Sequence, residues 1–103
     1  MPYAAFTTLH DAQLARDLAR TVVKERLAAC VQIGQVTSVF RWDGAVQEEP
    51  EFRLLFKTSA EALPNLKARA LSDHPYDEPA FWAVEMDTGS DSFFDWIHTE
   101  TKG

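Results

Sequence analysis

The feature that most constrains the fold is a long hairpin signal in the middle of the chain. Strand-forming residues occupy positions 30–42 and again 45–57, and Asp43-Gly44 separates the two runs. An Asp-Gly pair favours a two-residue hairpin turn, because glycine adopts positive φ angles without steric cost. Typical strands have about five or six residues, so a hairpin of this length must extend beyond a domain of 103 residues. Trp42 beside the tip favours packing of the tip on another surface.

The second arm of this hairpin contains an unusual acidic segment around a proline. Pro50 has no amide donor, so the arm is expected to be bulged or to lie at a sheet edge over residues 47–51. Glu48, Glu49 and Glu51 surround this proline. We expect the three carboxylates to form a solvated face that opposes strand aggregation.

Helix and strand signals alternate around the hairpin. Asp11 is a candidate N-cap for an amphipathic helix whose apolar residues recur as far as Leu27. Thr58 and Glu61 match a capping box that would start a second helix, ending near residue 72 before His74-Pro75. Strands are predicted over residues 3–9 and 80–86, and a last helix is predicted after a break at residues 88–91.

The resulting order is strand, helix, strand, strand, helix, strand, helix. A βαββαβ series indicates an α+β, ferredoxin-like sandwich, here a single domain over residues 1–103 with an extra C-terminal helix and a long hairpin. Two helices on one side leave the other sheet face uncovered. Burial therefore predicts an oligomer, in which the hairpin and last helix cover this face across subunits.

Composition limits the compartment and the partners. The chain has 16 acidic and 10 basic residues and a net charge of −6, without the Lys/Arg cluster that nucleic-acid binding requires. The longest uncharged stretch, residues 27–40, is too short and too polar to span a membrane. No basic, apolar leader is evident, and the single cysteine, Cys30, excludes an intrachain disulfide. These observations favour the cytoplasm.

The sequence lacks the usual motifs of an enzyme. It has no glycine-rich phosphate loop, paired-cysteine metal site, HExxH motif or serine in a glycine elbow. We therefore expect a non-enzymatic protein without an organic cofactor.

Four residues are candidate metal ligands, and each also has a structural interpretation. Cys30 is either a buried apolar residue or a soft-metal ligand. His74 either stabilises the end of a helix or binds copper or zinc through its imidazole. Asp77 and Glu78 follow His74 closely, and their carboxylates either belong to a polar turn or help to hold a cation.

Several segments together resemble one family. They are residues 25–31 (ERLAACV), 37–44 (TSVFRWDG), 56–58 (FKT), 74–79 (HPYDEP) and 94–97 (FDWI). In this order they are similar to the CutA divalent-cation tolerance proteins, and the resemblance covers almost the whole chain. It implies a ferredoxin-like subunit in a tight homotrimer, an architecture like that of PII signalling proteins, and a link to tolerance of copper and other divalent metals.

The resemblance also implies a ligand set that this chain carries only in part. Where family members with a proposed copper site have a cysteine near the end of the first strand, this chain has Thr7, and where they have a second histidine it has Asp73. Ala80 and Glu85 also depart from the family pattern. His74 is the ligand that carries over, so a high-affinity copper site within one subunit is not expected.

Three functional hypotheses follow. The first is a homotrimer that binds Cu²⁺ or another divalent cation through His74 with Asp77 or Glu78, assisted across a subunit interface by the acidic edge of the hairpin. The second is a PII-like regulator that binds a small anionic metabolite in the cleft between subunits. Its expected residues are Arg41, Trp42, Arg53, Lys57 and Tyr76. The third is a structural trimer that acts by binding a partner protein.

Overall fold

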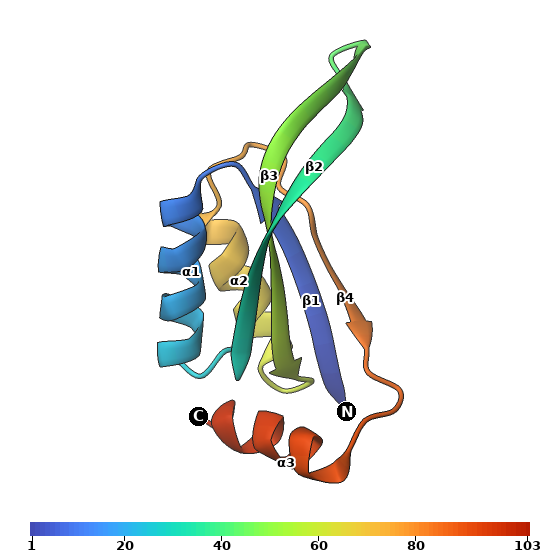
Figure 1. The fold of residues 1–103 in the computed structure, drawn as a ribbon. Coiled ribbons are helices and arrows are strands. Elements are labelled where there is room, and N and C mark those ends of the chain that lie inside the picture. The colour runs from blue at the N-terminus through green and yellow to red at the C-terminus, as the bar shows by residue number, and fades with distance from the viewer.

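The computed structural model describes residues 1–103 and has the predicted order of elements. They are β1 (Pro2–Leu9), α1 (Ala12–Lys24), β2 (Cys30–Trp42), β3 (Ala45–Ser59), α2 (Leu63–Asp73), β4 (Phe81–Glu85) and α3 (Asp91–Glu100). The four strands form one antiparallel sheet in the order β2-β3-β1-β4. Helices α1 and α2 cover one face of this sheet, and α3 crosses one end (Figure 1). No helix is both long enough and apolar enough to cross a membrane.

The core lies between the sheet and helices α1 and α2. Alternate residues of β1 and β3 point toward the helices and are fully buried, and the apolar sides of α1 and α2 meet them there. The core cluster comprises Ala5, Leu9, Ala15, Leu18, Ala19, Val22, Ala28, Leu54, Phe56, Leu66 and Ala70. This packing confirms the centre of the predicted apolar face of the first helix, whereas Leu14 and Val23 at its margins are 40% and 41% exposed.

The hairpin projects beyond the rest of the molecule, as its length predicts. Asp43 and Gly44 have φ angles of 52° and 77°, which is the turn geometry expected for Asp-Gly. Strand β1 pairs with β3 only as far as Leu9, opposite Phe52, so residues before Phe52 in β3 pair with β2 alone. Pairing through Pro50 is continuous, so this segment is an edge without a bulge.

The ends of the two core helices differ from the sequence-based prediction. Helix α1 stops at Lys24, and Arg26 adopts a left-handed φ of 60° that lets the Leu27 amide donate to the Val22 carbonyl at 2.8 Å. The predicted capping box at Thr58 is wrong. Thr58 belongs to β3, and its hydroxyl donates to the Leu27 carbonyl at 2.7 Å, whereas α2 begins only at Leu63.

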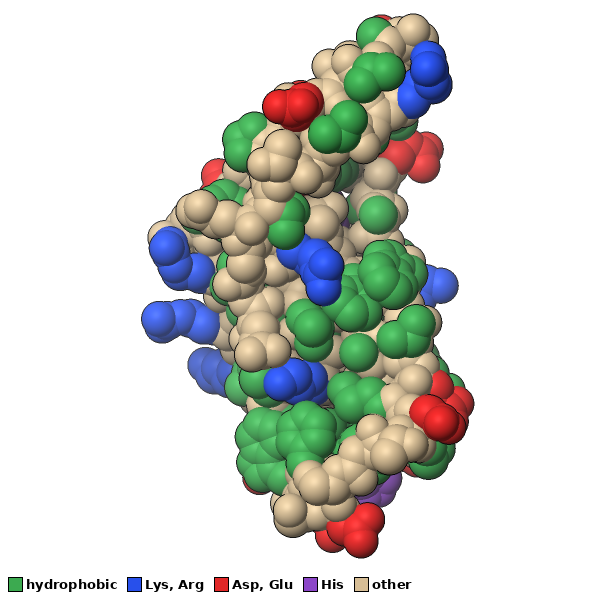
Figure 2. Space-filling model, turned by 45° about the vertical axis from the view of Figure 1, so that its right-hand side comes forward, with side chains coloured by type: hydrophobic (Ala, Val, Ile, Leu, Met, Phe, Trp, Pro, Cys, Tyr) green, Lys and Arg blue, Asp and Glu red, His purple; other side chains and the backbone are tan.

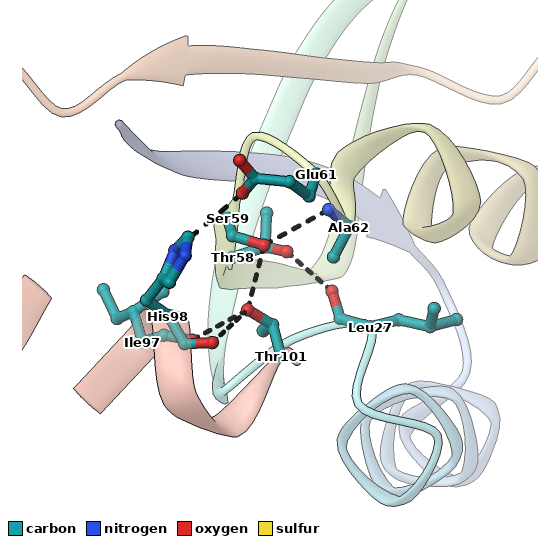
Figure 3. A network of polar contacts seen from close by, with 8 residues as sticks. All are labelled: Leu27, Thr58, Ser59, Glu61, Ala62, Ile97, His98 and Thr101. Atoms are coloured by element: carbon teal, nitrogen blue, oxygen red, sulfur yellow. Dashed lines mark hydrogen bonds and ion pairs between the residues drawn. The ribbon is translucent and has the colours of Figure 1, made fainter. Parts of the chain in front are cut away.

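A buried polar network fastens α3 to the end of β3 (Figure 3). The hydroxyls of Thr101 and Ser59 share a hydrogen bond of 2.9 Å, and Thr101 also donates to the Ile97 carbonyl at 2.8 Å. The Ala62 amide donates to the Ser59 hydroxyl at 3.2 Å. The last helix is therefore held by hydrogen bonds in addition to the burial of Ile97.

The sheet face opposite α1 and α2 is apolar and open. Figure 2 shows hydrophobic side chains gathered there, with basic side chains between them. Phe6 of β1 stacks on Trp82 of β4 with ring centroids 4.2 Å apart, and the Arg53 guanidinium lies 4.9 Å from the Phe6 ring centroid. We call this surface, with its exposed Trp82 and Val84, the open face.

Candidate functional site

His74 lies directly after α2, where its ring joins two parts of the chain. The residue before a proline avoids helical angles, and His74 accordingly has an extended backbone that ends the helix. Its Nε2 lies 2.9 Å from the Thr8 carbonyl oxygen, and its Nδ1 accepts a hydrogen bond of 3.2 Å from the Tyr76 amide. These partners require a neutral ring whose proton is on Nε2. Both ring nitrogens are therefore in use.

The surroundings of His74 favour this neutral form. Partial burial lowers the pKa of the imidazole, and this effect outweighs the Thr8 carbonyl and the Glu51 charge, which act in the opposite direction. A neutral imidazole is the form that binds a metal ion. A cation at Nδ1 would first have to displace the Tyr76 amide.

Tyr76 connects this histidine to the base of the hairpin. Its ring stacks on His10 with centroids 5.2 Å apart, and it meets the His74 ring edge-on at 4.7 Å. Its hydroxyl donates to Glu51 Oε2 at 2.7 Å. Burial raises the pKa of Tyr76, and the hydrogen bond to Glu51 and the nearby carboxylate charges raise it further. The phenol therefore remains protonated.

A groove of about 450 Å³ lies beside this cluster, where the hairpin leaves the sheet. Its walls come from the end of β1 and from facing parts of β2 and β3. The lining residues are His10, Gln35, Val36, Thr37, Pro50, Glu51 and Phe52. We call it the hairpin groove. The groove lies where β1 ends and β2 and β3 continue as a two-stranded hairpin (Figure 1).

The four expected metal ligands do not converge within one subunit. Asp77 and Glu78 are exposed in the loop after Tyr76. Cys30, half-buried at the start of β2, is opposite Lys57, which in turn is opposite Ala4 of β1. His74 contacts Thr8 of β1. Thr8 lies four residues beyond Ala4, which is about 13 Å along the strand at ~3.3 Å per residue, so His74 and Cys30 lie at different ends of β1. No group of three His, Cys, Asp or Glu residues is placed to hold one metal ion.

The residues expected to line an anion cleft are also dispersed within one subunit. Arg41 and Trp42 are exposed at the hairpin tip, whereas Arg53 and Lys57 lie further along β3. Arg53 lies over Phe6, and the Lys57 ammonium lies 5.5 Å from the Phe93 ring centroid. Tyr76 directs its hydroxyl to Glu51.

The sequence did not predict the role of two residues that line the hairpin groove, Glu51 and His10. Glu51 was expected to be solvated together with Glu48 and Glu49, but only 8% of it is exposed. The prediction is wrong for Glu51, because the loop after α2 covers it and Tyr76 binds it. His10 attracted no assignment, and only its stacking on Tyr76 shows its place.

Comparison with known proteins agrees with the resemblance seen in the sequence. The family model described as "CutA1 divalent ion tolerance protein" matches residues 3–100. The divalent-cation tolerance protein CutA of Thermus thermophilus is 39% identical over 102 residues, covering 98% of this chain and 99% of the relative. Mouse protein CutA is 36% identical over 100 residues, which span 96% of this chain but 56% of the mouse protein.

Solved structures of such proteins have the same fold. The divalent cation tolerance protein of Thermus thermophilus superimposes with a TM-score of 0.93, covering 99% of this chain and 100% of that one. CutA of Xylella fastidiosa, 35% identical, gives 0.94 and covers 98% of each chain. The chain therefore belongs to the CutA1 divalent ion tolerance protein family.

Proposed function

We propose that the protein is a non-enzymatic, cytoplasmic homotrimer that binds divalent cations, copper among them, and thereby contributes to metal tolerance. Membership of a divalent ion tolerance family over nearly the full chain carries this proposal. The proposed activity is reversible binding, which depends on the side chains that a cation can reach and on how the subunits associate.

The open face supports association of the subunits. Trp82 and Val84 of β4 are 52% and 48% exposed, although Trp82 stacks on the buried Phe6 and Val84 pairs with Ala4 in the neighbouring strand. Burying apolar surface contributes roughly 25 cal/mol per Å², and a contiguous apolar patch commonly marks an interaction site. A second copy that covers this face would remove these side chains from water.

The loop after α2 supports cation binding. It carries one neutral imidazole, His74, and two exposed carboxylates, Asp77 and Glu78. Imidazole and carboxylate groups suit Cu²⁺ and Zn²⁺. With so few protein donors, water would complete the coordination shell, and Nδ1 would have to give up its hydrogen bond. We therefore expect weak, exchangeable binding.

Native mass spectrometry with and without Cu²⁺ or Zn²⁺ tests both parts. We expect a trimer that takes up metal, and less uptake in His74→Ala and in the double variant Asp77→Asn/Glu78→Gln. The double variant changes only exposed side chains, so loss of folding would not explain its effect. Glu48→Gln is the control, because it removes a carboxylate elsewhere. Equal uptake in all four proteins would remove this loop from the proposal.

The oligomer is tested separately by introducing a charge. Trp82→Glu should lower the mass in solution from trimer toward monomer, because the charge would have to be desolvated in the interface. Leu14→Glu, at a 40% exposed position on α1, should leave the mass unchanged. If circular dichroism shows folded Trp82→Glu that remains a trimer, the open face is not the interface.

A further inference from the structure

The hairpin groove contains a buried carboxylate without a cationic partner. Glu51 is 8% exposed, and its side chain accepts one hydrogen bond, which Tyr76 donates to Oε2. None of the chain's ion pairs includes it. A carboxylate that is mostly removed from water requires hydrogen bonds from the protein or from the water that still reaches it. A single phenol satisfies only part of this requirement.

The second oxygen of this carboxylate is accessible from the groove. Oε1 makes no hydrogen bond within the chain, yet no buried side-chain oxygen or nitrogen lacks a partner. Oε1 must therefore be open to solvent, and the groove that Glu51 lines is the space beside it. An entering group would meet Oε1 directly and would also find a free lone pair on Oε2.

The charge and shape of the groove indicate the class of group that fits. No lysine or arginine is among its lining residues, and the charge of Glu49 is near enough to add to that of Glu51 in raising the pKa of Tyr76. The groove volume of about 450 Å³ matches small-molecule pockets, which range from roughly 300 to 1,000 Å³. A bare metal ion would find one carboxylate and one imidazole there and most of the space unfilled.

We propose that the hairpin groove binds a guanidinium group through Glu51. A guanidinium is planar and forms paired hydrogen bonds with a carboxylate, and the exposed ring of His10, stacked on Tyr76, offers a flat surface beside it. Thr37 and Gln35 add polar side chains to the wall. The group belongs either to a small molecule or to an arginine of a second copy of this chain.

Titration calorimetry with agmatine tests the first source. Agmatine should bind the wild-type protein, and N-(4-aminobutyl)urea, which keeps the ammonium but has a neutral urea in place of the guanidinium, should not. Glu51→Gln should weaken agmatine binding at least tenfold while keeping the oxygen that accepts the Tyr76 hydroxyl. Glu48→Gln, an exposed charge change on the same strand, should bind as the wild type does. Thermal unfolding of each variant establishes that it is folded.

Sedimentation of the same proteins tests the second source. If an arginine of a second copy fills the groove, agmatine will not bind the wild-type oligomer, and Glu51→Gln will dissociate at a higher protein concentration than Glu48→Gln. Agmatine binding that is unchanged in folded Glu51→Gln would overturn the proposal. Absence of agmatine binding together with unchanged association of Glu51→Gln would overturn it as well. Neither result depends on metal uptake by the loop after α2.

Discussion

The hydroxyl of Thr101 should contribute more to the free energy of unfolding than its position near the end of the chain suggests. Thr101 has one hydroxyl proton, which it donates to the Ile97 carbonyl at 2.8 Å, so the Ser59 hydroxyl must donate to Thr101 across the 2.9 Å contact. Ser59 is 3% exposed, and its oxygen already accepts from the Ala62 amide. In Thr101→Val the Ser59 proton would lose its only acceptor.

The magnitude follows from which groups lose a partner. The Ile97 carbonyl still accepts from the Thr101 amide at 3.2 Å, so only the Ser59 hydroxyl is left unsatisfied. Such a loss costs about 1–3 kcal/mol, and the added methyl group recovers a fraction of it. We expect Thr101→Val to lower the free energy of unfolding by about 1–2 kcal/mol. For a chain of this size, each kcal/mol corresponds to a decrease of roughly 4–8 °C in Tm.

Urea denaturation at one fixed protomer concentration measures this difference, because association would otherwise change the apparent stability. Thr101→Ser retains the hydroxyl, and Thr99→Val changes an exposed threonine on the same helix; both should remain close to the wild type. In a double-mutant cycle with Ser59→Ala, the double variant should lose less than the sum of the single losses, since no orphaned hydroxyl remains. Additive losses, or a wild-type midpoint for Thr101→Val, would refute the reasoning.

Two further predictions concern His74 and Arg26. Burial lowers the pKa of His74 in the folded state, so the unfolded chain binds a proton at this histidine more readily. The contribution of His74 to the free energy of unfolding is therefore present above about pH 6.5 and is lost as pH falls toward the lowered pKa. Urea midpoints at pH 7.5 and 5.5 should therefore differ more for the wild type than for His74→Gln, and equal differences would contradict this account. Arg26→Val should lower the free energy of unfolding by about 1–2 kcal/mol, because a β-branched residue resists a φ of 60°. Arg26→Gly should not lower it. If the urea midpoints of the two variants were indistinguishable, this backbone conformation would carry no strain.

The parts of the fold that were predicted correctly depend on local signals. The hairpin boundaries at residues 30, 42 and 45 match the structure because Asp43-Gly44 specifies the turn and the flanking residues favour strands. The Asp11 cap is confirmed by its side chain, which accepts from the Leu14 amide at 2.9 Å. In each case the deciding contact lies within a few residues, so the sequence alone contains the required information.

The capping box failed because a distant group competes for the same side chain. Thr58 has the residue type and spacing of a cap, but β3 continues through Ser59, and the Thr58 hydroxyl satisfies the Leu27 carbonyl in the loop after α1. Leu27 is separated from Thr58 by 31 positions. Tertiary pairing therefore overrides a local preference that is worth only about 1 kcal/mol.

The same limit explains what the sequence could and could not say about the candidate site. The motif around His74 predicts an imidazole beside two carboxylates, and it is confirmed that these residues share one loop. Whether the imidazole is free depends on Thr8, 66 positions away, and whether Glu51 is solvated depends on Tyr76, 25 positions away. Residue type is local, but burial and hydrogen-bonding state are set by the fold. A histidine identified as a ligand by its motif thus has both nitrogens in use, and a glutamate interpreted as a surface charge becomes the buried carboxylate of the groove.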